Sequence, residues 1–117
     1  MSKGILWVAT SKDDLIAFPE AAKRYIGFQL HTIQSGLQPL DWKPMPSIGP
    51  GVNEIRYKDK DGQFRVVYLT KFQDAIGVLH CFQKKGQKTT KKDIDLARKR
   101  YKDLIRERNK QNKKLGG

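Results

Sequence analysis

The sequence predicts an α+β fold, in which a small, mostly antiparallel sheet packs against an N-terminal helical hairpin and a C-terminal helix. Three observations predict it: apolar residues recur at helical spacing near both ends, strand-like runs follow one another in the middle, and turn residues separate these runs. The predicted order is β-α-α-β-β-β-α. With 117 residues, the chain fits one domain, residues 1–117. We place its core at about 5–105 and expect 106–117 to be a basic, frayed tail.

The first third of the chain predicts one strand and two helices. Residues 5–9 read as a short strand, and Ser11 is suited to cap a helix whose first turn is acidic. Pro19 ends this helix after Phe18 and suits the first turn of a second helix. The second helix has one apolar stripe, made of Ala22, Ile26, Leu30 and Ile33. Gly36 is a natural residue for its C-terminal end.

The middle of the chain predicts a loop and then three strands. Residues 37–51 hold four prolines and predict a loop that Trp42 and Met45 hold in place. The strands are expected at 52–58, 64–72 and 75–84. Residues 59–62 supply turn chemistry, with Gly62 free to take positive φ. The last two strands are apolar on both alternating faces, which indicates central strands that are covered on both sides.

A capped, basic helix is predicted at the C-terminal end. Thr90 is suited to cap it, with Asp93 three residues later in a weaker form of the capping box. Its buried stripe is expected to be Ile94, Ala97, Tyr101 and Leu104.

The charge is strongly positive and unevenly distributed. The chain has 24 Lys and Arg against 12 Asp and Glu, a formal net charge of +12. Residues 82–114 hold 14 basic and 4 acidic residues, so they carry +10 of that excess. Such an imbalance indicates an anionic partner, which is nucleic acid, an anionic membrane surface or an acidic protein.

Several function classes are excluded or disfavoured by composition. A single cysteine, Cys81, cannot form an internal disulfide, and with only His31 and His80 beside it a Cys-based zinc site is not expected. The apolar stretches are far shorter than the roughly 20 residues of a membrane span. The N-terminus lacks the apolar region of a secretion signal. We expect a soluble, cytoplasmic protein without metal or cofactor.

Motifs at residues 64–68, at residues 78–85 and in the opening of the chain together resemble the RelE/HigB toxin superfamily, in its phage-derived HigB-like branch. Residues 64–68, Phe-Arg-Val-Val-Tyr, resemble the core strand motif of these toxins. Residues 78–85, followed by 87–89 and 94–100, are similar to the HigB-like branch. The opening of the chain also fits, through Trp7, Lys12–Leu15 and Phe18–Pro19. The likeness covers about residues 5–105.

This resemblance implies a toxin of a type II toxin–antitoxin system. Such toxins are endoribonucleases that cut mRNA in the decoding site of the 70S ribosome, which stops translation and growth. The implied partner is a cognate antitoxin, in this branch a helix-turn-helix protein similar to HigA. RNA cleavage without a metal needs a base for the 2′-hydroxyl, a cation for the phosphorane and an acid for the leaving 5′-oxygen. The products are a 5′-hydroxyl end and a 2′,3′-cyclic or 3′-phosphate end.

Arg65 is the first candidate for the catalytic cation. Its planar, permanently charged guanidinium suits phosphate recognition, and its place in an apolar strand calls for a partner or a purpose. The alternative is a salt bridge to Glu54 on the neighbouring strand. Lys84 and Lys85 are further candidates, for charge stabilisation or proton transfer. Because successive strand residues face opposite sides, only one of them shares a face with Arg65, and the sequence leaves open which.

His80 and Arg56 complete the predicted catalytic set. Histidine titrates near neutrality and can serve as base or acid. His80 alternates with Val78 and Phe82 on one strand face, so the alternative is a core histidine. Arg56 lies where relatives often carry a basic residue. Tyr57, the next residue, either stacks on a base or packs in the protein.

Further basic residues are predicted to follow the ribosomal RNA backbone, with a contribution that weakens at high salt. They are Lys58, Lys88, Lys91, Lys92 and Arg98. Two other functions remain open at this stage. The chain is either a nucleic-acid-binding module without catalysis, or an interaction protein whose basic helix binds an acidic partner.

Overall fold

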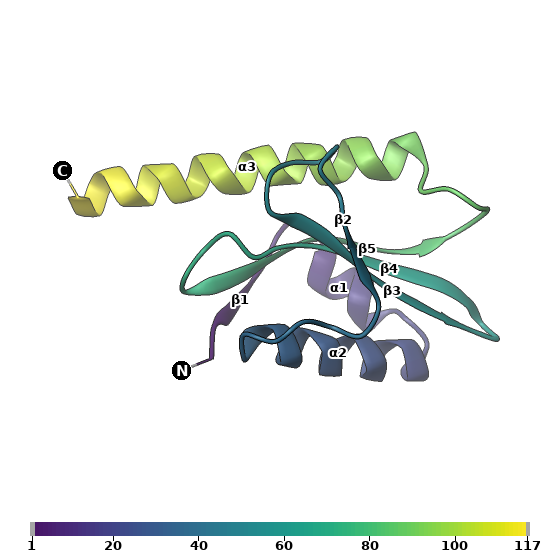
Figure 1. Cartoon of the computed structure of the whole chain (residues 1–117). Helices are drawn as coiled ribbons and strands as arrows, with labels where there is room; N and C mark the ends of the chain where they lie inside the picture. The colour runs from purple at the N-terminus through teal and green to yellow at the C-terminus, as the bar shows by residue number, and fades with distance from the viewer. Residues whose placement is uncertain (1, 117) are drawn as a thin grey trace.

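A computed structural model describes the backbone of residues 2–116 and the side chains of residues 2–112, and within them a sheet of five strands lies between helices (Figure 1). The elements are β1 (Gly4–Trp7), α1 (Ser11–Ile16), α2 (Glu20–Gln34), β2 (Trp42–Pro44), β3 (Val52–Asp59), β4 (Gly62–Leu69), β5 (Ala75–Lys84) and α3 (Lys91–Gly116). The strand order is β1-β5-β4-β3-β2. Strand β1 runs parallel to β5, and the other neighbours are antiparallel. The predicted fold class is therefore confirmed.

Strand β2 corrects the predicted element order. Residues 37–51 are predicted to form a loop, but residues 42–44 pair antiparallel with Asn53–Ile55 of β3. The order is therefore β-α-α-β-β-β-β-α. The prolines of this segment favoured a loop in the prediction. A proline is nevertheless compatible with the end of an edge strand, where its missing N–H removes no hydrogen bond between strands. Pro44 occupies such a place.

Most of the predicted signals at the helix ends are found in the structure, but some differ. Helix α1 begins at Ser11, but the buried Ser11 hydroxyl donates to the Val78 carbonyl, 3.0 Å away, and caps nothing. Pro19 lies immediately before α2, as its N-cap residue, and not in the first turn as predicted. Gly36 takes φ +86° beyond the C-terminal end of α2, as predicted. Thr90 caps α3, because its Oγ1 accepts a hydrogen bond from the Asp93 amide at 3.2 Å. Helix α3 continues to Gly116, through the segment that we had expected to fray.

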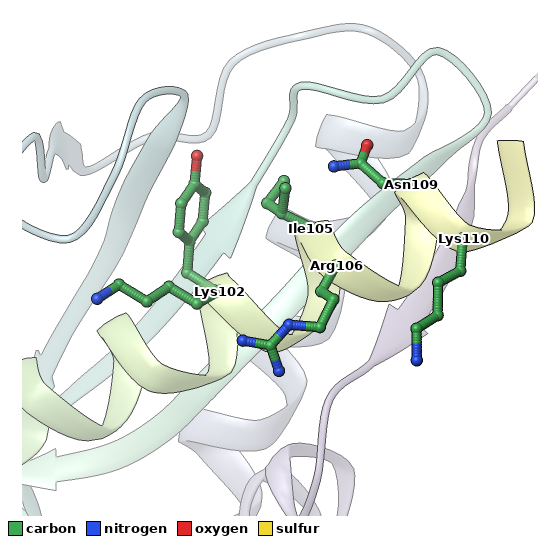
Figure 2. A pocket seen from close by; sticks show the side chains of 6 residues that line it. Lys102, Ile105, Arg106, Asn109 and Lys110 are labelled. Atoms are coloured by element: carbon green, nitrogen blue, oxygen red, sulfur yellow. The ribbon is translucent and has the colours of Figure 1, made fainter. Parts of the chain in front are cut away.

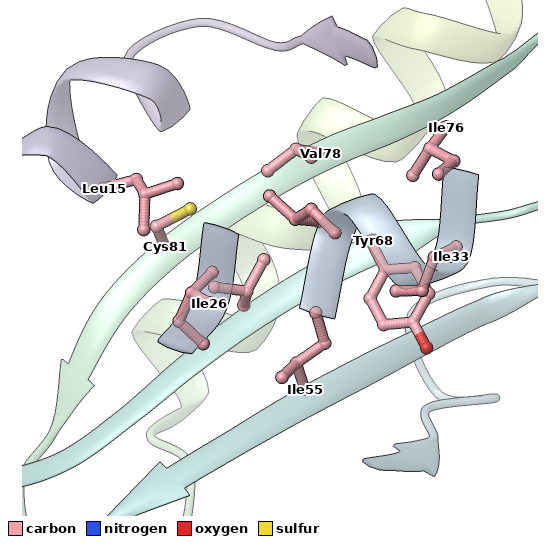
Figure 3. Packing of buried hydrophobic residues seen from close by; sticks show 10 residues of the cluster. Leu15, Ile26, Ile33, Ile55, Tyr68, Ile76, Val78 and Cys81 are labelled. Atoms are coloured by element: carbon pink, nitrogen blue, oxygen red, sulfur yellow. The ribbon is translucent and has the colours of Figure 1, made fainter. Parts of the chain in front are cut away.

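Two hydrophobic layers hold the helices against opposite faces of the sheet. The predicted stripe of α2 is buried, and Ile26, Leu30 and Ile33 pack on sheet residues such as Ile55 and Tyr68 (Figure 3). On the other face, the predicted stripe of α3 packs on residues of β3, β4 and β5. Strands β4 and β5 are thus covered on both sides, as their sequences predicted.

An irregularity in β5 changes which of its side chains share a face. Val67 of β4 pairs with His80, whereas the next residue, Tyr68, pairs with Val78, so Leu79 is an extra residue in the ladder. The prediction that Val78 and His80 share a face is therefore wrong. Val78 packs on the α1–α2 side, while His80 reaches toward α3.

Helix α3 is long but strongly charged. No helix within residues 2–116 combines the length and apolar character that a membrane crossing requires. The N-terminal part of α3 covers the sheet, and the C-terminal part of α3 extends past the sheet at the end where the chain also begins (Figure 1).

We predict that Ile26→Ala destabilises the fold by about 2–5 kcal/mol, because it leaves a cavity between α2 and the sheet. Ile26 is 0 % exposed, whereas Ile16 on α1 is 54 % exposed and serves as the matched control. Urea denaturation followed by circular dichroism measures both variants. Equal losses in Ile26→Ala and Ile16→Ala would contradict this description of the core.

Candidate functional site

A hollow lined mainly by cationic and polar groups opens where β3 continues beyond its pairing with β2. That pairing ends at Ile55, so residues 56–59 of β3 pair only with β4. The hollow has a volume of about 300 Å³. We call it the cationic hollow, and its walls are Asp41, Arg56, Tyr57, Lys58, Gln63 and Arg65. Three predicted site residues, Arg56, Lys58 and Arg65, thus meet in one place.

The register of the sheet decides which lysine joins Arg65. Arg65 pairs with Arg56 on one side and with Phe82 on the other, and Gln63 pairs with Lys58 and Lys84. Directly paired residues share a face, so Lys84 lies on the same side of the sheet as Arg65. Lys85 follows the end of β5 and is exposed. The structure therefore brings Lys84, and not Lys85, to the site.

Arg65 forms the ion pair with Glu54 that was predicted as the alternative, and it also lines the cationic hollow. It is 7 % exposed, and its Nε lies 3.5 Å from Oε1 of Glu54, which is the internal ion pair. Nη1 donates to the Phe64 carbonyl and Nη2 to Oε1 of Gln63, both at 3.1 Å. Each terminal nitrogen carries two N–H groups, so these contacts leave one on each for a ligand in the hollow.

Glu54 is the buried counter-charge of Arg65. It is 0 % exposed, and neither of its carboxylate oxygens accepts a hydrogen bond from the side chains and backbone that the structure describes. Burial raises the pKa of Glu54, and the Arg65 cation opposes that shift. Burial likewise lowers the pKa of Arg65, and Glu54 opposes it. Each charge therefore stabilises the ionised form of the other in a place with little water.

Lys84 completes the cationic group from β5. The pKa of Lys84 is lowered by burial first and by the neighbouring Arg65 second, while Glu54 raises it. A lysine with a lowered pKa transfers protons more readily near neutral pH than an ordinary lysine does.

Lys43 is a charged neighbour that the sequence analysis missed. It lies on β2 directly opposite Glu54 and lowers the pKa of both Glu54 and Lys84 by its charge. Its segment reads as a proline-rich loop, and only the pairing of β2 with β3 brings it to the site.

Arg56 has an acidic partner that the sequence analysis also missed. Its Nε and Nη2 donate to Oδ1 of Asp41 at 3.0 and 2.8 Å. The Arg56 amide donates to the Asp41 carbonyl at 2.9 Å, which fixes the segment before β2 against the edge of β3. Arg56 is therefore a partly neutralised wall of the cationic hollow, while the exposed Lys58 forms its rim.

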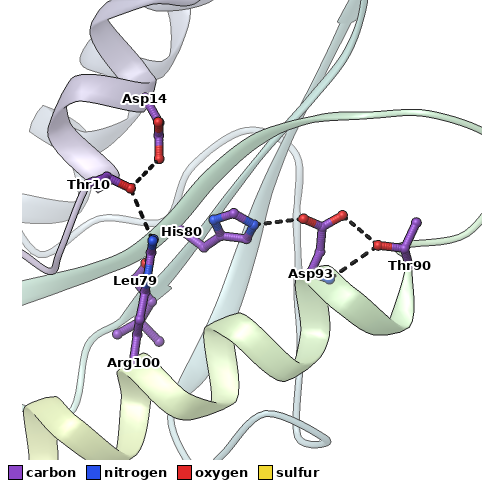
Figure 4. A network of polar contacts seen from close by, with 7 residues as sticks. All are labelled: Thr10, Asp14, Leu79, His80, Thr90, Asp93 and Arg100. Atoms are coloured by element: carbon purple, nitrogen blue, oxygen red, sulfur yellow. Dashed lines mark hydrogen bonds and ion pairs between the residues drawn. The ribbon is translucent and has the colours of Figure 1, made fainter.

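His80 belongs to a different group of contacts. Its Nε2 lies 2.8 Å from Oδ1 of Asp93, whose Oδ2 accepts a hydrogen bond from Thr90 at 2.7 Å (Figure 4). The ring is stacked on Phe82 with centroids 4.6 Å apart, and the residue is 6 % exposed. His80 does not line the cationic hollow. These contacts favour the structural alternative, in which His80 ties β5 to the start of α3.

The residues predicted to follow RNA have different surroundings. Lys88, Lys91 and Lys92 are exposed, in the loop after β5 and the first turn of α3. This loop and the β3–β4 turn extend toward the same end of the sheet (Figure 1). Arg98 donates through Nε and Nη2 to the Ser47 carbonyl at 3.1 and 2.8 Å, so it ties α3 to the loop after β2.

A second hollow lies along α3 and holds none of the predicted site residues. It is bounded by side chains of this helix alone (Figure 2), namely Tyr101, Lys102, Ile105, Arg106, Asn109 and Lys110. Among the described residues, no three His, Cys, Asp or Glu side chains come together as metal ligands would.

Comparison with known proteins gives one family. The family model described as "Phage derived protein Gp49-like (DUF891)" matches residues 13–102 of the chain. No curated protein sequence matches it significantly.

We predict that Glu54→Leu destabilises the fold by about 3–5 kcal/mol, because it leaves Arg65 as a buried cation without its counter-charge. The double variant Glu54→Leu/Arg65→Met should recover most of this loss, since both charges are then replaced by apolar groups. Urea denaturation of the single and double variants measures the coupling.

The control is the exposed pair of Glu20 and Lys23 on α2, where Glu20→Gln should leave the denaturation midpoint almost unchanged. A Glu54→Leu midpoint as high as that of Glu20→Gln would show that the buried pair does not stabilise the site.

Proposed function

Because the chain belongs to the phage-derived Gp49-like family, within the RelE/ParE-like toxin superfamily, we propose that it is the toxin of a type II toxin–antitoxin system and cleaves mRNA on the ribosome. The observation that supports this most directly is the cationic hollow. It contains a permanently charged guanidinium that is paired with Glu54. Lys84 does not line the hollow, but it lies on the same face of the sheet, and the charge of Arg65 contributes to lowering its pKa.

The proposed reaction is a transesterification, in which phosphorus exchanges its bond to the 5′-oxygen for a bond to the 2′-oxygen of the preceding nucleotide. A base takes the proton of the 2′-hydroxyl, the 2′-oxygen attacks phosphorus, and the bond to the 5′-oxygen breaks. The products are a 2′,3′-cyclic phosphate, which water can open to a 3′-phosphate, and a 5′-hydroxyl. No step requires a metal ion.

Arg65 and Lys84 have complementary roles in this proposal. The two N–H groups of Arg65 that remain free for a ligand bind the non-bridging oxygens and stabilise the negative charge of the phosphorane. Lys84, whose pKa is lowered, donates a proton to the leaving 5′-oxygen. Arg56 and Lys58 hold the flanking phosphates at the rim of the cationic hollow.

The ribosome supplies the RNA in this proposal, and an antitoxin keeps the toxin silent. Lys88, Lys91 and Lys92 contact the ribosomal RNA backbone at the end of the sheet where the cationic hollow opens, with an affinity that falls as salt rises. The antitoxin is proposed to be a helix-turn-helix protein similar to HigA.

A nucleic-acid-binding module without catalysis is the second candidate function. The exposed lysines around the start of α3 favour it equally. It differs from the first in giving Arg65 only the structural role of pairing with Glu54, and Arg65 lies on β4, outside the basic C-terminal third.

We predict that expression of the wild-type protein alone arrests growth, and that Arg65→Ala and Lys84→Met restore it. Loss of a proton-transferring group such as Lys84 typically lowers a rate by about 10²–10⁴-fold, and loss of a donor that stabilises transition-state charge, as proposed for Arg65, by about 10²–10³-fold. Either loss is enough to relieve growth arrest. Arg106→Ala is the control, because this arginine is exposed on α3 outside the cationic hollow. Growth and translation rate after induction are measured, with circular dichroism of each purified variant to verify folding.

Since Arg65→Ala leaves Glu54 without its partner, the folded double variant Glu54→Leu/Arg65→Met serves as a second test. Full toxicity of this double variant would refute the role of Arg65.

We further predict that mRNA is cut with 5′-hydroxyl ends only when ribosomes are present. Mapping of RNA ends in a purified translation system, with and without ribosomes, measures this. Efficient cleavage of naked RNA would contradict the ribosome dependence, and binding without any cleavage would favour the second candidate function.

A further inference from the structure

An apolar surface lies on the outer side of α2, next to the edge of β3. Phe28 is 64 % exposed and Leu40 is 80 % exposed, although both are large and hydrophobic. Together with Tyr25 and Tyr57 they line one open hollow. We call these four residues the aromatic shelf.

Partly buried hydrogen bonds and a pair of rings in contact hold the aromatic shelf in place. The Leu40 amide donates to Oε1 of Gln29 at 2.8 Å, and Gln29 is itself 1 % exposed. The rings of Tyr25 and Tyr57 lie with centroids 4.5 Å apart and planes tilted by 32°. The Tyr57 hydroxyl donates to Oδ2 of Asp59 at 3.0 Å. The exposed apolar groups therefore sit on an ordered base, and the exposure of Leu40 is fixed by the fold.

The aromatic shelf is continuous with the cationic hollow. Tyr57 lines both. Leu40 of the shelf precedes Asp41, which lines the hollow and accepts hydrogen bonds from Arg56. The two surfaces thus adjoin around the edge of β3, where no further strand covers it.

This arrangement matches the two ends of a nucleotide. A phosphate requires cations and N–H donors, whereas a base requires flat apolar surfaces, and single-stranded RNA is commonly held by both together. We propose that the aromatic shelf binds the base of a nucleotide adjacent to the phosphate in the cationic hollow, with Phe28 as its exposed stacking face. This inference rests on the proposed function, because it takes RNA as the ligand of the hollow.

The exposed basic groups around the shelf favour RNA over a protein segment. Arg24 lies in its wall with 78 % of its side chain exposed, and its ion pair with Glu20 is a long one of 3.7 Å. In the adjoining hollow, Arg56 is paired with Asp41, and Lys58 is exposed at the rim. Stacking on aromatic rings accepts any base, so the aromatic shelf would add affinity without a strong sequence preference.

The test uses short single-stranded RNAs with 2′-O-methyl sugars, which cannot be cleaved, and fluorescence anisotropy at low salt. One RNA carries every base, and others of the same length and charge lack the base at one position. We expect wild type to bind the complete RNA about ten-fold more tightly than the best-placed abasic RNA. Phe28→Ala should abolish this preference, and Phe28→Trp should retain it because an aromatic face remains.

Leu37→Ala is the matched control, since Leu37 is 65 % exposed and lies outside the aromatic shelf. It should bind both RNAs as wild type does, and thermal melting verifies that every variant is folded. An unchanged base preference in Phe28→Ala, or none in wild type, would overturn the proposal. If Phe28→Ala keeps the base preference and no longer binds a co-expressed antitoxin, the surface docks a protein and the proposal is also overturned.

This assay needs neither a ribosome nor cleavage, so its outcome is separate from that of the proposed function. Base preference in a protein that cuts no mRNA in cells would support the aromatic shelf and refute the toxin activity. Cleavage of mRNA in cells by a protein without base preference would support the toxin activity and refute the role of the aromatic shelf.

Discussion

The ion pair between Glu54 and Arg65 is the interaction on which the candidate site depends. Both charges lie inside a sheet that is covered on each face, where an unpaired charge is costly. Their mutual attraction offsets that cost and fixes the guanidinium against the strand. Together with the hydrogen bonds to Phe64 and Gln63, the ion pair holds Arg65 in one orientation in the wall of the cationic hollow. Such a preorganised cation need not rearrange when negative charge develops beside it.

The short edge strand β2 gives the site its opening. It pairs with β3 only as far as Ile55, so the rest of β3 is uncovered and its side chains line hollows on both sides of the sheet edge. A longer β2 would continue the ladder along Arg56 and Tyr57 and close this edge. Because β2 has only three residues, β3 is paired on this side up to Ile55, and the residues after Ile55 can receive a ligand.

Some basic side chains tie the elements of the fold together, whereas others remain exposed. The extra residue at Leu79 turns His80 toward Asp93, so that its contacts join β5 to α3. Arg98 joins α3 to the loop after β2 in the same way. Lys88, Lys91 and Lys92 form no such ties in the part of the chain that the structure describes, and they remain exposed beside the open end of the sheet.

The sequence by itself determined the fold class, the helices and the three long strands, because apolar periodicity and turn residues are local signals. The choice of Arg65 came from the resemblance of residues 64–68 to a toxin strand motif and from the place of a charge on an apolar strand, and its catalytic role stays a prediction. It also named Glu54 as the possible partner of Arg65. Only the tertiary structure decided that Lys84 and not Lys85 joins them, that His80 faces α3, and that Lys43 and Asp41 reach the site. These outcomes depend on strand register, on one extra residue in β5 and on the pairing of a proline-rich segment, all of which arise from contacts between residues distant in sequence.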